Sequence, residues 1–256
     1  MKNIGNEYEQ KALQELKAWQ KAMQHKPTLF NKIAKNMQIK MNRIIPEKVH
    51  KVITTAIKQM VRGVLFGAEL TTAKPLQNAA LEVREARIDE RIKFYKTTAA
   101  AEGGITGAGG ILLGLADFPL LLGLKLKLLF EIASLYGHYA NDYKERVYIL
   151  YIFQLAFSSH EHRRNIYLRM VNWKEQSGQL PEDIHQFDWR SLQQEYRDYI
   201  DLAKMAQLVP VIGAPVGIVV NYRLIKKLGN TAINAYRMRW AEEKKLINAD
   251  DRLLPS

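Results

Sequence analysis

The spacing of apolar residues predicts helices along most of the chain. Apolar side chains recur three and four positions apart, and no long stretch alternates strictly between apolar and polar residues as an exposed strand would. The clearest example begins at Pro46 and Glu47, where a wide apolar stripe follows a helix start signal. The stripe comprises Val49, Val52, Ile53, Ala56, Ile57, Met60, Val61, Val64 and Leu65. We therefore predict an all-α protein in which this stripe is part of the core.

Other segments follow the same rule. The predicted helices span 7–25, a segment from Pro27, 75–101, a segment from Asp142, 160–175, and a segment from Asp188 to about 207. Acids and bases crowd residues 75–101, which predicts a solvent-exposed helix face with ion pairs. Asn141 or Asp142 is the expected N-cap of the next helix, and Glu145 lies three residues after Asp142, as in a capping box. These elements predict a multi-helix bundle.

The most apolar stretch of the chain covers residues 103–137. It reads GGITGAGGILLGLADFPLLLGLKLKLLFEIASLYG, and Asp117 is its only charged residue as far as Leu124. A phosphate-binding loop would need a GK[ST] ending, which is missing. A membrane span needs about 20 apolar residues, and a central aspartate disfavours one. The step ADFP instead predicts that Asp117 caps a helix with Pro119 in its first turn, which divides the stretch into helices 104–115 and 118–136.

A second apolar stretch, QLVPVIGAPVGIVVNYRLIKKLGNTAINAYRMRW, has a similar design, with glycine and proline before a helix that carries basic residues. We expect the two stretches to form apolar, Gly- and Pro-containing helical hairpins that pack as the core of the bundle. Gly103, Gly107 and Gly110 would then allow close helix packing. Shallow insertion of a hairpin into a membrane remains open.

The amino-acid composition bears on the size of the core, on the chemistry of possible sites and on the cellular location. The hydrophobic content of 47% is enough to bury a sizeable core, and the absence of cysteine excludes disulfides and thiolate sites. The N-terminal residues contain no apolar signal sequence, so we expect a cytoplasmic location.

The formal net charge of +12 is concentrated near the N-terminus. Between Leu16 and Arg62 the only acid is Glu47, whereas lysines and arginines recur throughout. Such a segment favours an anionic surface. A membrane surface would attract the lysines while apolar side chains enter the interface. The expected contacts are Lys26, Phe30, Lys32, Ile33, Lys35, Met37, Lys40 and Arg43. Nucleic-acid binding, with Trp19 and Phe30 for stacking, and an ordinary solvated helix are the alternatives.

Several motifs occur in a characteristic order along the chain. They are Asp117 with Pro119, Tyr136 with Gly137, Glu145 with Arg146, Pro210 with Gly213, and Asn221 with Tyr222. With the glycine-rich lead-in, this order resembles the EcsC family of bacterial proteins over about residues 40–245. The resemblance implies an association with an Ecs-type ABC transporter, and it implies no reaction. We expect basic amphipathic helices in 1–45, an EcsC-like helical domain in 46–245, and a tail in 246–256.

The chain contains no HExxH, GxSxG or paired-carboxylate motif. His160 and His162 are two positions apart and diverge on a helix, so they predict a solvated helix start rather than a metal site. We expect no cofactor and no metal. The residues singled out as a functional polar cluster are Asp117, Glu102, Glu145, Arg146, Asn221, Tyr222 and Arg223. Asp117 is the first candidate in this cluster, because an acid within apolar surroundings must cap a helix, pair with a cation or have a function.

The function that these observations favour is a non-enzymatic accessory or regulatory protein, peripheral on the inner face of the cell membrane. Its expected partner is an anionic membrane surface or a membrane protein complex, with an ABC transporter as one candidate. Nucleic acid is not an expected partner, and the oligomeric state stays open. The first alternative is a hydrolase or metal-dependent enzyme with a site around Asp117. The second is a nucleic-acid-binding protein that uses the basic N-terminal region.

Overall fold

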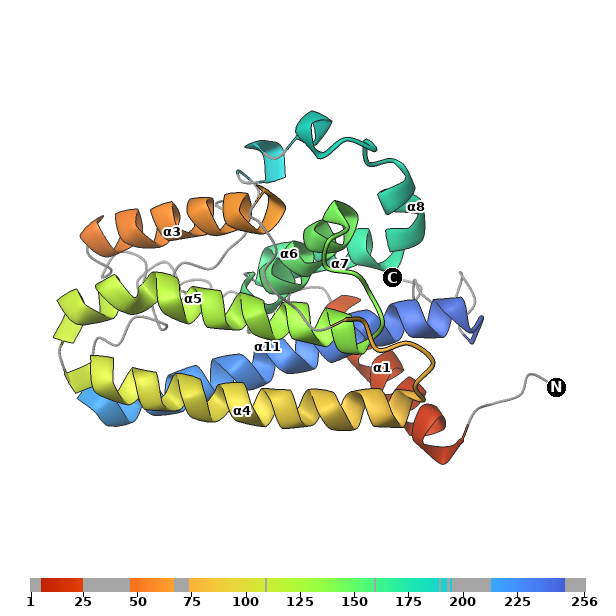
Figure 1. Ribbon diagram of the computed structural model, residues 1–256, viewed down its shortest axis with the longest axis horizontal. Coiled ribbons are helices and arrows are strands. Elements are labelled where there is room, and N and C mark those ends of the chain that lie inside the picture. The colour runs from red at the N-terminus through yellow and green to blue at the C-terminus, as the bar shows by residue number, and fades with distance from the viewer. Residues whose placement is uncertain are drawn as a thin grey trace.

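The computed structural model describes residues 6–24, 47–66, 74–108, 110–158, 160–188, 190–192, 194 and 213–246. In these residues every element of regular secondary structure longer than one residue is a helix (Figure 1). They are α1 (Glu7–Gln24), α3 (Glu47–Phe66), α4 (Leu81–Ala108), α5 (Gly110–Leu135), α6 (Tyr143–Phe157), α7 (His160–Val171), α8 (Trp173–Gly178), the 3-10 helix η1 (Ile184–Gln186) and α11 (Gly213–Glu243). The predicted all-α bundle is confirmed.

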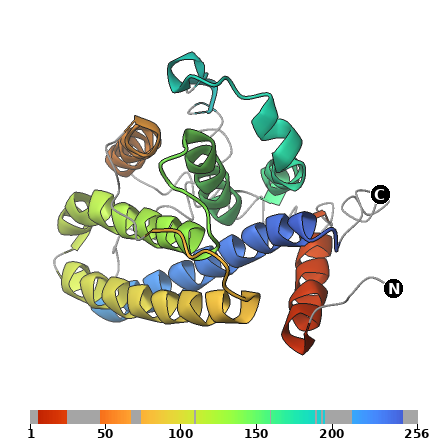
Figure 2. The same ribbon diagram turned by 45° about the vertical axis from the view of Figure 1, so that its right-hand side comes forward.

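The long helices α4, α5 and α11 form the base of the molecule. α4 and α5 run side by side, and α11 packs along α4 more extensively than any other pair of described helices pack together (Figures 1 and 2). Arg237 near the end of α11 reaches Glu85 near the start of α4, and Tyr222 meets Lys96 further along α4. The two helices are therefore antiparallel. α3 packs on α5 and α6, while α1 contacts α11, α7 and α4.

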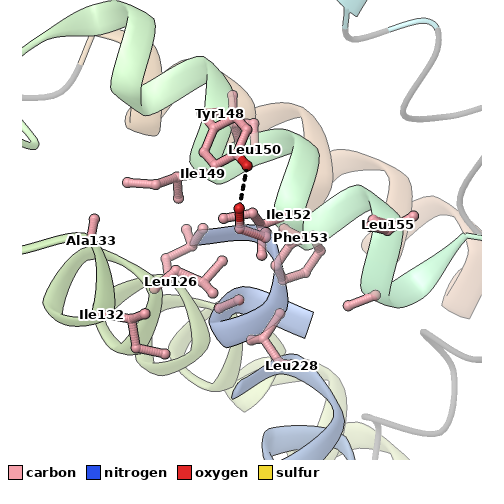
Figure 3. Packing of buried hydrophobic residues seen from close by; sticks show 14 of the residues in the cluster. Leu126, Ile132, Ala133, Tyr148, Ile149, Leu150, Ile152, Phe153, Leu155 and Leu228 are labelled. Carbon is pink, nitrogen blue, oxygen red and sulfur yellow. Dashed lines mark hydrogen bonds between the residues drawn. The ribbon is translucent and has the colours of Figure 1, made fainter. Parts of the chain in front are cut away.

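The core lies between α3, α5, α6 and α11. Figure 3 shows Leu126 of α5 directed toward Ile152 and Phe153 of α6. The Tyr148 hydroxyl donates a 2.8 Å hydrogen bond to the carbonyl oxygen of Ala235, which ties α6 to α11 (Figure 3). The predicted α3 stripe is confirmed as core wherever its side chains are described, apart from the half-buried Val52. Its buried members are Ile53, Ala56, Ile57, Met60, Val61 and Val64.

Several helix boundaries differ from the sequence prediction, and the helix predicted for residues 75–101 begins only at Leu81. α4 continues to Ala108 and α5 begins at Gly110 with Pro119 inside it, so the predicted helix start at Asp117 is wrong, as is the predicted end of the preceding helix at residue 115. The chain changes helix within the glycine-rich run, where a reversal of direction meets the least steric resistance. A proline inside a helix removes one backbone hydrogen bond. Burial of Phe118 and Leu122 on the same helix offsets that loss.

The helix end predicted at Tyr136 and Gly137 is confirmed. Gly137 has φ of +96°, the N–H of His138 donates to the Ala133 carbonyl, and the N–H of Gly137 donates to the Ser134 carbonyl. This is a Schellman ending, which requires a left-handed residue and therefore favours glycine. It places His138 directly beside the last turn of α5.

Asp142 caps α6 as predicted, since its carboxylate accepts from the Lys144 N–H at 2.9 Å. The second half of the expected capping box does not form. The Asp142 N–H donates to the Tyr139 carbonyl, and Glu145 points instead into the interior. The Asp188 carboxylate accepts from the Ser191 N–H at 3.0 Å, as a cap should.

Of two further sequence predictions, one is corrected by the structure and the other lies where the structure gives no description. The predicted helix 160–175 is divided into α7 and α8, which are separated at Asn172. The predicted helix from Pro27 and the membrane-surface set from Lys26 to Arg43 lie outside the described residues.

Candidate functional site

The members of the predicted polar cluster whose side chains the structure describes lie in separate parts of the molecule. Glu145 lies beside Arg239, whereas Asn221, Tyr222 and Arg223 lie about 24 Å away along α11 at about 1.5 Å per residue. Arg146 donates to the carbonyl oxygen of Ala140 at 2.8 Å. The backbones of Glu102 and Asp117 are helical, but their side chains lie outside the described part of the chain. The enzyme alternative built on Asp117 therefore stays a prediction.

Glu145 is the centre of a buried ion-pair group. One of its carboxylate oxygens accepts from the Tyr236 hydroxyl at 2.6 Å, and the other accepts from Nη1 of Arg239 at 2.6 Å. Nη2 of Arg239 donates to Nδ1 of His138 at 3.0 Å. The Arg239 guanidinium also lies over the Tyr148 ring, 4.9 Å from its centroid. The group therefore joins α6, α11 and the turn after α5.

A second group surrounds Glu85 of α4. Nε and Nη2 of Arg237 donate to its two oxygens at 2.8 and 2.6 Å, which is a bidentate pair. The hydroxyls of Tyr136 and Tyr8 donate to the same carboxylate at 2.8 and 2.7 Å. Nη1 of Arg237 reaches Glu15 of α1 at 2.8 Å. Three helices, α1, α4 and α11, and the turn that follows α5 thus meet at this carboxylate or its partner arginine.

The two groups form one network. The rings of Tyr136 and Tyr236 stack with centroids 5.1 Å apart, and His138 stacks on Tyr236 at 5.3 Å. We call the set Glu85, Tyr136, His138, Glu145, Tyr236, Arg237 and Arg239 the buried network. Each oxygen of Glu85 already accepts two hydrogen bonds, so its acceptor capacity is used within the fold. The network fixes the register of α11 against α4 and α6.

Burial and charge together set the protonation of this network. Burial, followed by the charge of Glu85, raises the pKa of Tyr136 well above its usual value, and burial with the charge of Glu145 does the same for Tyr236. Burial also lowers the pKa of His138 to about 4, despite the opposing influence of Glu145. A neutral His138 is what the geometry requires, because arginine can only donate and Nδ1 must accept.

Sequence reasoning missed Glu85, since it assigned residues 75–101 to a solvated face. Glu85 is only 3% exposed. A local signal was present. Leu81, Ile88, Ile92 and Tyr95 are buried with spacings of three and four, and Glu85 falls on the same stripe. An acid on a core stripe requires a buried partner, but nothing local could identify Arg237.

The opposite end of the same three helices is apolar. Residues 97–108 of α4, 110–124 of α5 and 213–220 of α11 contain only Glu102 and Asp117 as charged residues. These helix ends lie together at the left of Figure 1, and the Lys96 ammonium over the Tyr222 ring at 4.3 Å confirms the contact of α4 with α11 there. We call these three segments the apolar end.

Aromatic and cationic side chains border the apolar end. Leu120 within it is 57% exposed, and Phe94 and Tyr222 beside it are 51% and 42% exposed. The neighbouring exposed or half-buried cations are Lys93, Lys96, Lys127, Arg223 and Lys226. The other large apolar side chains exposed in the described residues, Val83 and Tyr139, lie near the buried network. The molecule therefore presents apolar residues and cations together at one end.

The part of the chain that the structure describes contains neither a metal-binding cluster nor a membrane-spanning helix. In that part of the chain, no group of three or more His, Cys, Asp or Glu side chains is arranged to hold a metal ion. Nor does any helix in it combine the length and apolar character that crossing a bilayer would require.

Comparison with known proteins identifies relatives over nearly the whole length. The model of the EcsC protein family matches residues 10–241. Protein EcsC of Bacillus subtilis (strain 168) is 41% identical over 232 residues, which covers 90% of this chain and 95% of that protein. The uncharacterized protein YdbA of the same organism is 25% identical over 247 residues, covering 89% of this chain and 90% of YdbA. No solved structure matches the chain at a significant level.

Proposed function

This chain belongs to the EcsC protein family, and we propose that it is a non-enzymatic accessory or regulatory protein that docks on the cytoplasmic face of the membrane. Its partner there would be an ABC transporter or another membrane complex, as the family resemblance implies. Docking would use the apolar end, with the basic segment 25–46 as an electrostatic contribution.

The observation that carries the proposal is the joint placement of apolar helix ends, aromatic rings and cations. Helices that present an apolar surface bordered by lysines and aromatic rings lie well in a bilayer interface, because each chemical type meets its preferred depth. Here Leu120 would enter the apolar layer while Tyr222 and Lys96 lie at the level of the headgroups. The cations would gain about 1 kcal/mol each near an anionic surface.

Vesicle co-sedimentation tests the docking. The wild-type protein should bind vesicles of phosphatidylcholine mixed with phosphatidylglycerol, and it should bind pure phosphatidylcholine vesicles more weakly. Leu120→Glu and Phe94→Glu should each weaken binding by about tenfold or more, since burying one large apolar side chain contributes about 1.5–3 kcal/mol.

The chain supplies matched controls for these variants. Val83 is 45% exposed and Tyr139 is 62% exposed, and both lie near the buried network rather than the apolar end. Val83→Glu and Tyr139→Glu introduce the same charge at similar exposure and should leave vesicle binding unchanged. Equal losses in all four variants would show that charge alone matters, and an absence of wild-type binding at low salt would refute the docking.

A further inference from the structure

A basic groove of about 390 Å³ lies between α1, α6, α7 and α11. The residues that line it are Trp19, Met23, Leu155, Arg163, Arg223, Lys226, Lys227, Asn230 and Thr231. Two chemical types are present, an apolar part from α1 and α6 and a cationic part from α7 and α11. None of the lining residues that the structure describes is acidic.

Helix geometry brings the cations to one side. Arg223, Lys226, Lys227, Asn230 and Thr231 are spaced by three, four, seven and eight positions from Arg223, so they share one face of α11. Arg163 approaches from α7. Four cations therefore surround a single concave space.

The apolar wall is held firmly in position. The Trp19 ring packs edge-on against Tyr167 of α7 with centroids 5.8 Å apart. One turn later, Nε2 of Gln24 donates to the Tyr167 hydroxyl at 3.3 Å. These contacts fix the last turns of α1 against α7, so the indole and Met23 form a preformed surface beside the cations.

Arg163 differs from the arginines of the buried network. Arg237 and Arg239 each pair with a carboxylate at 2.6 Å, whereas half-buried Arg163 makes no hydrogen bond or ion pair with another described residue. Burial lowers the pKa of the Arg163 guanidinium, and no acid among the described side chains opposes the effect. A cation held partly out of water without a counter-charge costs free energy. An anionic ligand would supply the missing charge.

We propose that this groove binds a phosphate group carried on an apolar moiety. Arginine offers forked donors that match phosphate oxygens, and lysines add point charges that suit a doubly charged phosphate monoester better than a carboxylate. The indole of Trp19 and the side chains of Met23 and Leu155 would cover the apolar part. This division between an apolar wall and a few directed polar groups is typical of small-molecule sites.

The same chemistry could come from a lipid headgroup or from a soluble phosphate ester, and the experiment separates them. Isothermal titration calorimetry would compare short-chain dihexanoyl phosphatidic acid below its micelle concentration, dihexanoyl phosphatidylcholine and inorganic phosphate. We expect phosphatidic acid to bind at least about tenfold more tightly than phosphatidylcholine, because one charge-assisted hydrogen bond contributes about 1.5–3 kcal/mol. Comparable affinity for inorganic phosphate would show that the apolar wall adds nothing to binding, which would contradict the proposal in favour of a site for soluble phosphates.

Three variants locate the binding. Arg163→Gln and Lys226→Gln should each weaken phosphatidic acid binding by at least about tenfold. Lys174→Gln removes the same charge from exposed Lys174 of α8, outside the groove, and should leave the affinity unchanged. Circular dichroism confirms that each variant is folded, and the exposed Lys226 provides a test that does not disturb a buried side chain.

The groove proposal and the docking proposal can fail separately. Leu120→Glu should weaken vesicle docking by about tenfold or more and leave the binding of monomeric phosphatidic acid intact. Arg163→Gln should weaken phosphatidic acid binding by at least about tenfold and leave most of the vesicle docking in place. Undetectable binding of both phosphatidic acid and phosphate at millimolar concentration would overturn the groove proposal. So would equal affinity in Arg163→Gln, Lys226→Gln and the wild type, or tighter binding of a single-stranded oligonucleotide.

Discussion

The two ends of α11 handle positive charge in opposite ways. Near its C-terminal end, Arg237 and Arg239 are enclosed by helices and each is matched by a carboxylate. Toward its N-terminal end, Arg223 and Lys226 are exposed beside apolar helix segments. α11 therefore carries buried arginines paired with carboxylates near its C-terminal end and exposed cations nearer its N-terminal end.

This difference separates stability from binding. Charges that have left water must be paired inside the fold, and their removal disturbs packing across several helices. Exposed charges contribute little to folding, since water and salt screen them. We therefore expect substitutions at the buried network to change the free energy of unfolding, and substitutions at the apolar end to change binding.

The largest effect is expected from Arg237→Leu, which leaves Glu85 buried without its cation. We expect a loss of about 3–5 kcal/mol in the free energy of unfolding, measured by urea denaturation. The double variant Glu85→Leu with Arg237→Leu should recover a large part of the loss, because neither variant position then leaves a buried charge without its partner.

Arg91 supplies the matched control for this change. It pairs with Glu131 at 2.6 Å, but its side chain is 39% exposed. Arg91→Leu should therefore cost about 1 kcal/mol or less. Equal losses in Arg237→Leu and Arg91→Leu would mean that burial of the network does not distinguish it from an ordinary surface pair.

The contrast between the two ends also separates the features that the sequence predicts from those that it does not. The helices α1 and α3 were predicted because a three- and four-residue period is a local property. The Glu85–Arg237 pair was not, since its members are far apart in the chain and each is surrounded by ordinary helical sequence. The apolar character of the apolar end was predicted from the sequence. The helix start predicted at Asp117 is wrong, because α5 continues through Pro119, and Phe118 and Leu122 are buried in the core.

The candidate site was predictable only in pieces. Glu145 was chosen as the possible partner of a cap, and its burial against Tyr236 and Arg239 followed from tertiary contacts. Arg223 follows an apolar run in the sequence, and the groove that it lines requires side chains from three other helices. Residue types could be recognised in advance, whereas their assembly depends on packing.

Because His138 titrates, the pH dependence of the free energy of unfolding reports on the buried network. The pKa of His138 is about 4 in the folded chain and about 6.5 in the unfolded chain. Between these two pH values His138 binds a proton in the unfolded chain but not in the folded chain. The free energy of unfolding therefore falls as the pH falls from 6.5 to 4. Above pH 6.5 both forms are neutral, and this histidine contributes no pH dependence.

His138→Gln should remove that part of the pH dependence. The wild type should lose roughly 3 kcal/mol more than the variant between pH 7 and pH 4, as measured by urea unfolding at several pH values. Glutamine keeps an acceptor for Arg239 but does not titrate. Parallel pH profiles for the two proteins would refute the neutral, buried assignment of His138.

Gly229 tests the close contact of α4 and α11 between the two ends. A Cβ at this position would lie 2.5 Å from Cδ1 and 2.8 Å from Cγ1 of Ile92. Gly229→Ala should destabilise the fold by about 1–3 kcal/mol despite the better helix propensity of alanine. Adding Ile92→Ala should reduce that penalty, whereas Gly123→Ala, with nothing within 4 Å, should stabilise by up to about 1 kcal/mol.

The smallest effect on stability is expected at the apolar end itself. Leu120 is 57% exposed on α5, so Leu120→Glu exchanges one good helix former for another at a position that water already reaches. The free energy of unfolding should change by no more than about 0.5 kcal/mol. Vesicle binding by the same variant should nevertheless fall by about tenfold or more. A loss of stability comparable to that of Arg237→Leu would show that Leu120 is part of the folded core, and the two ends of α11 would then no longer divide folding from docking.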